Sequence, residues 1–325
     1  ETLLFGVRGW RAMLAAIGGL GLLAAFAISC CMVEPKRDPG SHTAETGDCA
    51  STPKRACEGR EELARFARLL CIPSFAALLG QGIFGCMAMF ASGFDLLYLR
   101  HCGHSAANIG LMTFCTGAAA LVASPLNGAI PDAFARRSAS HGRPCAAQIS
   151  VIAGGLCFIA WVLAAPQVST LFVTVGMCLQ VFVCGWVTPG VKLPILTEIV
   201  GPGERSTTMA WLATLEGSLG GLLGPPSVGF IAEHVFHYVA LDEEREHQSE
   251  AARRENARAL GSAMLLCTVL PWALQAVVFF PMLHCSYARD SAAARAYEYE
   301  QGPEDANAEE ASSTFASVVG LSACD

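Results

Sequence analysis

Long uncharged stretches separated by short polar segments dominate the pattern along this chain. A helix needs about 20 apolar residues to cross the ~30 Å hydrocarbon core of a bilayer. The stretches that meet this length are Ala12–Val33, Leu69–Phe94, Ile109–Pro131, Pro144–Val191, Ser206–Ala232 (with one interruption) and Ala259–Leu283. The fourth has room for two spans, with Ala165–Pro166–Gln167 as the break between them. The pattern therefore predicts an all-α integral membrane protein with about seven transmembrane helices.

The polar segments divide the chain into four predicted parts. Residues 1–33 hold the first helix, whose apolar stretch exceeds the ~7–15-residue core of a secretion signal. Residues 34–68 form a linker that ends in a basic amphipathic stretch, predicted to lie on the membrane surface. Residues 69–283 form a six-helix bundle. Residues 284–325 form an acidic tail that we expect to be disordered, because it has too little apolar surface to bury.

Composition and charge placement agree with a membrane protein. Hydrophobic residues make up 53% of the chain, charged residues 15%, and the mean hydropathy is +0.44. Soluble proteins carry about a quarter charged residues. Most basic residues fall in 34–68, 132–143, 192–205 and the tail, which are the segments on one side of the predicted membrane. Because cytoplasmic loops carry the excess of Lys and Arg, we expect the C-terminus to be cytoplasmic.

Motifs of soluble enzymes are missing from the sequence. It has no phosphate-cradling Gly-Lys-Ser/Thr loop, no His-Glu-x-x-His metal motif and no nucleophile elbow. Its 15 cysteines do not have metal-binding spacing. We therefore expect no enzyme activity, no cofactor, no metal and no nucleic-acid partner, and the lipid bilayer as the main partner.

Glu216 is the most informative single residue in the spans. It lies about 10 residues into its predicted helix, so a rise of 1.5 Å per residue places it ~15 Å deep. Intramembrane acids are functional candidates by default, although a structural hydrogen bond to another helix is an equal alternative. Spans 69–94, 109–131 and 259–283 contain no Lys, Arg or His, so we expect any counter-ion to come from helices outside this chain, from substrate or from water. The residues that follow predict a thin, bendable helix: Gly220, Gly221, Gly224, Pro225 and Pro226.

The polar loop after the third span combines small, acidic and basic residues: Gly128, Asp132, Arg136 and Arg137. This loop resembles the loop signature of the major facilitator superfamily, although Ala133 and Ala135 depart from it. The Gly would let helices approach closely. Asp132 would pair with the arginines and latch one conformation. The alternative is that the arginines are ordinary residues of a cytoplasmic loop.

Other segments extend this resemblance over roughly residues 8–283. They are RGWR (Arg8–Arg11), VEPKR (Val33–Arg37), HGRPCAAQIS (His141–Ser150) and ERSTTMAWLATLEGSLGGLLGPPSVGFIAEHV (Glu204–Val235). The last two resemble an uncharacterised plant, algal and protist branch, and more distantly the Spinster-type lipid carriers. The resemblance implies helices 6–12 of the fold, so that helices 1–5 are expected as a missing partner.

The same resemblance implies which residues face a central cavity. The second span corresponds to helix 7, with Gln81, Phe84 and Met87, and the fifth to helix 10, with Gln180 and Trp186. A buried Gln needs a partner, so each either binds substrate or bonds a neighbouring helix. Phe84 and Met87 either line the cavity or pack.

The expected function is secondary transport of an unidentified small solute or lipid by alternating access, with Glu216 as the candidate for proton coupling. One alternative is a seven-helix receptor, and another is a non-transporting fragment that packs against a partner. The segments PLNGAIPD (Pro125–Asp132) and PSVGFIAE (Pro226–Glu233) argue for a carrier. They repeat one pattern with opposite predicted topology, as in the inverted repeats of many secondary transporters.

Overall fold

The chain divides into two units, Glu1–Cys57 and Glu58–Asp325, and each is described by itself. A computed structural model describes residues 3–4, 7–32, 55–239 and 249–301. In the first unit, strands β1 (Leu3–Leu4) and β2 (Val7–Arg8) pair antiparallel ahead of helix α1 (Gly9–Cys31). None of the apolar window of α1 is buried by the protein. A helix that is apolar on all sides and unburied requires lipid as its solvent.

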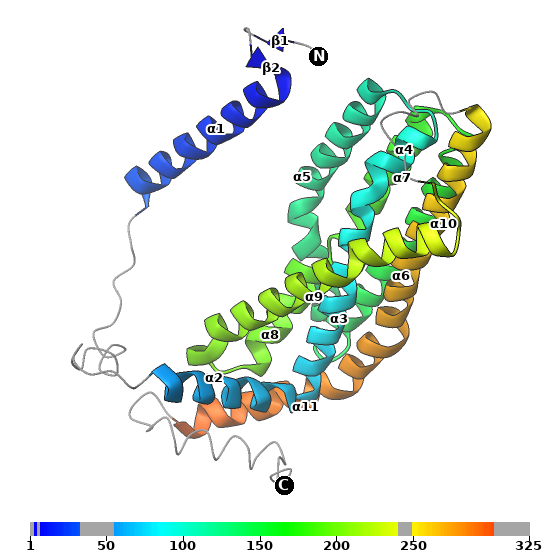
Figure 1. The fold of residues 1–325 in the computed structure, drawn as a ribbon. Coiled ribbons are helices and arrows are strands. Elements are labelled where there is room, and N and C mark those ends of the chain that lie inside the picture. The colour runs from blue at the N-terminus through cyan, green and yellow to red at the C-terminus, as the bar shows by residue number, and fades with distance from the viewer. Residues whose placement is uncertain (1–2, 5–6, 33–54, 240–248, 302–325) are drawn as a thin grey trace. The chain divides into compact units, whose positions relative to one another are not determined.

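The second unit is built from helices, several of which pass through short irregular turns (Figure 1). Its first half contains α2 (Arg55–Leu70), α3 (Pro73–Ala91), η2 (Ser92–Phe94), α4 (Asp95–His101), α5 (Ala106–Arg137) and α6 (Gly142–Ala164). Its second half contains α7 (Thr170–Cys184), η3 (Thr188–Lys192), α8 (Leu193–Ile199), η4 (Pro202–Glu204), α9 (Arg205–His234), α10 (Glu250–Leu274), η6 (Gln275–Phe279) and α11 (Phe280–Gln301). The segments η3 and η6 are π-helical turns.

The all-α membrane fold expected from the apolar stretches is confirmed. Within the described residues, six helices are long and apolar enough to cross a membrane, and they include α1. The remaining predicted span, Ser206–Ala232, is α9, a helix of 30 residues that is not among those six. The predicted break is also present, because α6 ends at Ala164 and α7 begins at Thr170.

The helix α3 lies at the centre of the second unit, where it packs against α9, α10 and α11. The helices α5, α6 and α7 pack against one another, and α6 also contacts α10. One apolar core surrounds the first half of α3 and contains Phe75, Leu78 and Phe280. A second surrounds α4 and contains Tyr98 and Trp161. The middle of α3, between these cores, carries the polar site described below.

Two predicted boundaries differ from the structure. Residues 34–68 were expected to be linker, but α2 is helical from Arg55, and it runs across one end of the unit (Figure 1). The Phe66 ring anchors α2 against Phe75 of α3 and Trp211 of α9. Linker residues 33–54 lie outside the described residues.

The disordered tail was expected from residue 284, but α11 stays helical to Gln301. The helix continues because polar side chains of α11 are buried against the start of α3. The Asp290 carboxylate accepts a hydrogen bond from the Ser74 backbone nitrogen at 2.9 Å, and the Ser74 and Ser286 hydroxyl oxygens lie 2.8 Å apart. The carboxylate thus caps the first turn of α3. Tail residues 302–325 lie outside the described residues.

Candidate functional site

A buried ion pair occupies the centre of the second unit. The Lys192 Nζ atom, at the end of η3, lies 2.5 Å from Oε2 of Glu216 in the middle of α9. Glu216 is only 2% exposed and Lys192 only 9%. The second carboxylate oxygen of Glu216, Oε1, has no hydrogen-bond partner among the described residues. One carboxylate oxygen is therefore committed to Lys192 and the other is open to a proton or a donor group.

The expectation that Glu216 would lack a counter-ion from this half of the protein was wrong. It rested on spans that carry no basic residue and placed Lys192 in a loop after the fifth span. Lys192 is the charged residue at which the predicted stretch Pro144–Val191 ends. Instead of ending there, the helical run continues through the π-helical turn η3 (Thr188–Lys192) to Ile199. Lys192 therefore enters the bundle, and such turns are frequent at functional sites.

Glycines at the contact between α3 and α9 leave room for the Lys192–Glu216 ion pair. A Cβ atom added at Gly82 would lie 1.8 Å from Oε1 of Glu216. Gly220 and Gly224 follow Glu216 on the same face of α9, and a Cβ at Gly220 would lie 2.4 Å from the Cys86 Cβ. Glycine at these positions lets two helix backbones approach closely.

The glycines of α9 therefore have a packing role in the structure. A Cβ at Gly224 would lie 2.6 Å from the Met87 carbonyl oxygen, while one at Gly221 would make ordinary contact with Phe90. The helix continues through Pro225 and Pro226. The expected bending of this segment stays a prediction.

A pair of buried amides lies on the same stretch of α3. The Gln81 Nε2 atom donates to Oε1 of Gln275 at 3.4 Å, and both residues are buried. The remaining amide atoms, Oε1 of Gln81 and Nε2 of Gln275, have no partner among the described residues. Gln275 is the first residue of the π-helical turn η6. The sequence interpretation missed Gln275, although a lone Gln in an apolar span had identified Gln81.

The aromatic and thioether candidates of α3 adjoin this group. Phe84 stacks on Phe279 with 5.7 Å between ring centroids, and both are half-buried. Met87 is half-buried where α3 meets Gly224 of α9. Phe84 therefore packs within the bundle and keeps part of its ring exposed.

Gln180 of α7 and Trp186, which follows α7, have local partners. The Trp161 Nε1 atom of α6 donates to Oε1 of Gln180 at 2.6 Å, so Gln180 bonds a neighbouring helix. The Trp186 Nε1 atom donates to the backbone carbonyl of Phe182 at 3.0 Å. Of the two readings of Gln180, this geometry favours the structural one.

Asp132, expected to act in a latch, forms an ion pair between α5 and α6, but with a different arginine. Asp132 pairs with Arg143 at 2.9 Å, whereas Arg136 and Arg137 are exposed in the last turn of α5. The same Arg143 nitrogen donates to the carbonyl of Gly190 at 2.7 Å. Arg143 forms the ion pair because it lies in the first turn of α6, and α6 packs directly against α5 and η3.

Gly128 does not make the close approach that was expected of it. A Cβ added there would meet no atom within 4 Å. The close approach belongs to Gly190, where a Cβ would lie 2.4 Å from the carbonyl oxygen of Asn127. The tight packing in this region thus lies between Gly190 of η3 and Asn127 of α5, the residue before Gly128.

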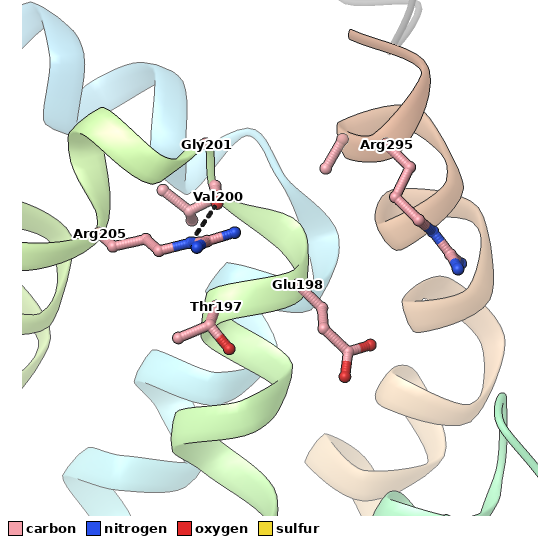
Figure 2. Close-up of a pocket in the computed structure, with 7 residues that line it drawn as sticks. Thr197, Glu198, Val200, Gly201, Arg205 and Arg295 are labelled. Carbon is pink, nitrogen blue, oxygen red and sulfur yellow. Dashed lines mark hydrogen bonds between the residues drawn. The ribbon is translucent and has the colours of Figure 1, made fainter. Parts of the chain in front are cut away.

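A small pocket of about 160 Å³ lies near the same end of the unit, between the α8–α9 connection and α11. Figure 2 shows Arg205 on the α9 side, Arg295 on the α11 side and Glu198 between them. The Arg205 Nε atom donates to the Val200 carbonyl at 3.3 Å, and the Tyr287 hydroxyl donates to Glu198. The pocket is smaller than the ~300–1,000 Å³ typical of ligand sites.

Comparisons with known proteins agree with this fold. One solved structure with a similar fold is the crystal structure of a bacterial homologue of the human lysosomal transporter Spinster, in an inward-facing and unoccupied conformation. The TM-score is 0.57 at 20% identity, and the alignment covers 89% of this chain and 62% of that one. The chain thus spans less than two thirds of that structure, and at this identity the likeness shows a shared fold.

The sequence itself identifies the family. No curated protein matches the chain. The Major Facilitator Superfamily matches it over residues 2–239, which is well over half of its length and includes α1, the buried Lys192–Glu216 pair and the Asp132–Arg143 pair. The chain therefore belongs to the Major Facilitator Superfamily.

Proposed function

We propose that the chain is part of a secondary active carrier that moves a small solute or lipid across a membrane by alternating access. Membership of the superfamily supports this, as does the fold shared with a bacterial homologue of a transporter. The observation that carries the proposal is the buried Lys192–Glu216 ion pair, which lies between the two apolar cores.

Stability alone does not account for such a pair. Removing two charges from water costs several kcal/mol per ion, and an apolar pair of similar volume is often as stable or more stable. In this site the compensation is incomplete, because Oε1 of Glu216 is buried without a partner. Costly and partly satisfied intramembrane charges are typical of ion pathways and proton relays. The pair is therefore better explained by a working role than by packing.

The role that fits this geometry is proton coupling. While Glu216 is ionised, it holds Lys192 and thereby ties α9 to η3. A proton on the carboxylate removes the attraction and releases Lys192. The face of α9 that meets the second half of α3 carries Gly220 and Gly224, and α9 would shift along this face. Proton binding would in this way favour one conformation of the alternating-access cycle.

The Asp132–Arg143 pair connects the cytoplasmic end, as we orient the chain, to the same turn. Arg143 holds the Gly190 carbonyl, two residues before Lys192. Protonation of Glu216 would release Lys192, and loss of the Arg143 hydrogen bond would release the Gly190 carbonyl. Both changes would therefore act on the turn η3. Gln81 and Gln275 supply the free amide atoms that a polar group of the substrate could use, with Phe84 as an apolar contact.

The proton role is tested without knowing the substrate. The chain is reconstituted in nanodiscs, and infrared difference spectra are recorded between pH 5 and pH 8. We expect a carboxylic-acid C=O band that is absent from Glu216→Gln. The matched control Glu198→Gln changes a carboxylate outside the buried pair and should retain the band. Persistence of the full band in Glu216→Gln would contradict the proposal.

Transport itself is tested with the intact carrier in proteoliposomes that contain a pH-sensitive dye. Outside addition of a panel of lysophospholipids, sugars and organic anions should give inward proton movement for at least one compound. The Glu216→Gln variant should lose that proton movement at normal reconstituted amounts. If a compound is taken up by this variant with the same pH dependence, then proton coupling lies elsewhere.

Family membership argues against the receptor alternative. The alternative of a non-transporting fragment is tested by experiment; the alignment with the Spinster homologue covers 62% of that structure. We expect helices 1–5 of the fold to be required for transport. Uptake by the chain alone is therefore compared with uptake after co-expression of a five-helix segment from the same coding locus. Equal uptake in the two preparations would exclude that requirement.

A further inference from the structure

A larger pocket of about 530 Å³ lies at the opposite end of the second unit from Asp132. It is enclosed by α4, the end of α6 and the first turns of α10, and its lining includes Tyr98, His101, Leu163, Arg253, Arg258 and Leu265. The volume is within the range typical of small-molecule sites. No residue of the Lys192–Glu216 site lines it, so the two sites are separate.

Three arginines on the first turns of α10 line this pocket: Arg253, Arg254 and Arg258. Arg254, Arg258 and Leu265 follow one another at helical spacing on the same face. Arg254 pairs with Glu250 at 3.4 Å, but both side chains are mostly exposed. Within the part of the chain that the structure describes, Arg253 and Arg258 have no ion pair. Because the N-terminal end of a helix already carries positive potential, this cluster favours an anion.

The turn between α4 and α5 lies beside Arg253. Gly103 has a φ of +93°, a left-handed conformation that favours glycine. A Cβ added at Gly103 would be in ordinary contact with a terminal nitrogen of Arg253, 3.4 Å away. The glycine therefore permits a turn that adjoins the Arg253 guanidinium group.

The floor of the pocket is closed and uncharged. The Tyr98 hydroxyl donates to the Val162 carbonyl. The Tyr98 ring packs closely on Gly261, where an added Cβ would lie 2.8 Å from a ring carbon. His101 is 4% exposed, and its Nε2 atom lies 3.1 Å from the Tyr238 hydroxyl. Burial and, second, the nearby Glu233 raise the pKa of Tyr238, so its hydroxyl is neutral at physiological pH.

One wall of the pocket continues onto the apolar surface of the helices. Leu163 of α6 lines the pocket and is 59% exposed, and Leu266 next to Leu265 is 44% exposed. In a membrane, such apolar side chains face acyl chains. The pocket thus offers guanidinium groups at one end and a lipid-facing apolar wall at the other. A ligand that matches both is an amphiphile with an anionic head.

We propose that this pocket binds an anionic phospholipid of the surrounding bilayer, with its phosphate at Arg253 and Arg258 and one acyl chain along Leu163. Guanidinium groups bind phosphate oxygens through paired hydrogen bonds, and Ser262 and Gln167 add polar groups to the lining of the same pocket. The site is independent of the proposed transport function.

The test measures lipid binding by native mass spectrometry of the purified chain. Phosphatidylglycerol should remain bound at detergent conditions that remove phosphatidylcholine. The double variant Arg253→Gln/Arg258→Gln should weaken phosphatidylglycerol binding by about tenfold or more, as expected for two basic residues near a lipid phosphate. Arg253→Lys/Arg258→Lys keeps the charge and should restore most of the binding. Arg136→Gln/Arg137→Gln removes two exposed arginines elsewhere and should bind like the unchanged chain.

Further arms separate a lipid from a free phosphate and from misfolding. Leu163→Gln should weaken phosphatidylglycerol binding although all the arginines remain. Lipid-free melting temperatures of the variants are measured in parallel, and the lysine pair reports on the site even if the glutamine pair is unstable. The proposal is overturned by equal binding of phosphatidylcholine, by unchanged binding in the glutamine pair, or by inorganic phosphate raising the melting temperature as much as phosphatidylglycerol does.

Discussion

Arg143 donates from a single nitrogen to the Gly190 carbonyl at 2.7 Å and to the Asp132 carboxylate at 2.9 Å. Gly190 belongs to the π-helical turn η3, whose last residue, Lys192, pairs with Glu216. The ion pair between α5 and α6 and the buried ion pair therefore both hold the same five-residue turn. This arrangement leads to predictions that separate the contributions of the two pairs.

The first prediction concerns the loss of one charge from the buried pair. Lys192→Met leaves the Glu216 carboxylate buried without a cation, which should lower the free energy of unfolding by about 3–5 kcal/mol. The double variant Lys192→Met/Glu216→Leu removes both charges and should recover most of that loss. Thermal unfolding of the chain in detergent at pH 8 measures both. A double variant no more stable than the single one would show that the pair does not act as a unit.

The second prediction compares two glycines on different helices. Gly82→Ala would place a Cβ atom 1.8 Å from the Glu216 carboxylate, which is held by Lys192 and cannot move without breaking the pair. We expect a loss of about 1–3 kcal/mol, typical of overpacking. Gly128→Ala is the matched control, because a Cβ there meets nothing within 4 Å. Alanine in a helix should stabilise this position by about 0.5–1 kcal/mol. Melting temperatures that shift in the same direction for both variants would contradict the difference in packing between Gly82 and Gly128.

The third prediction concerns the hold of Arg143 on η3. Arg143→Gln removes the ion pair with Asp132 and weakens the bond to the Gly190 carbonyl. Backbone amides of residues 188–192 should then exchange hydrogen faster, as measured by mass spectrometry. Arg137→Gln changes an exposed arginine in the preceding turn and should leave this exchange unchanged. Equal exchange in the two variants would mean that Arg143 does not hold η3.

The apolar pattern predicted the fold well because membrane helices depend on length and hydropathy, which are properties of the sequence alone. The break at Ala165–Pro166–Gln167 and the burial of Glu216 followed from the same pattern. It failed at Lys192 because a charged residue ends an uncharged stretch and was therefore placed in a loop, whereas the helical run continues through the turn η3, where Gly190 packs against Asn127. Which side chains meet across helices depends on such turns, and no local pattern encodes them.

The same limit explains the other differences. The sequence indicated which loop carries an acidic–basic pair, but the choice of Arg143 over Arg136 depends on where α6 packs. The helicity of α11 beyond residue 284 depends on a tertiary cap, because Asp290 bonds the start of α3 from far along the chain. The local sequence of an acidic segment gives no information about a partner such as the Ser74 backbone nitrogen.

The fourth prediction distinguishes substrate binding from packing at Gln81 and Gln275. Each single change to Leu leaves the other amide buried without its partner, which should cost about 1–3 kcal/mol. The double variant Gln81→Leu/Gln275→Leu removes both amides and, with them, the unpartnered Oε1 and Nε2 atoms, so its stability should equal or exceed that of the unchanged chain.

If the free amide atoms serve the substrate, this stable variant should still lose uptake of whichever compound the proteoliposome panel identifies. Gln180→Leu is the matched control, because its oxygen is already bonded to Trp161. It should lose stability and keep uptake in proportion to the folded amount. A stable double variant with full uptake would show that the two amides only pack against each other.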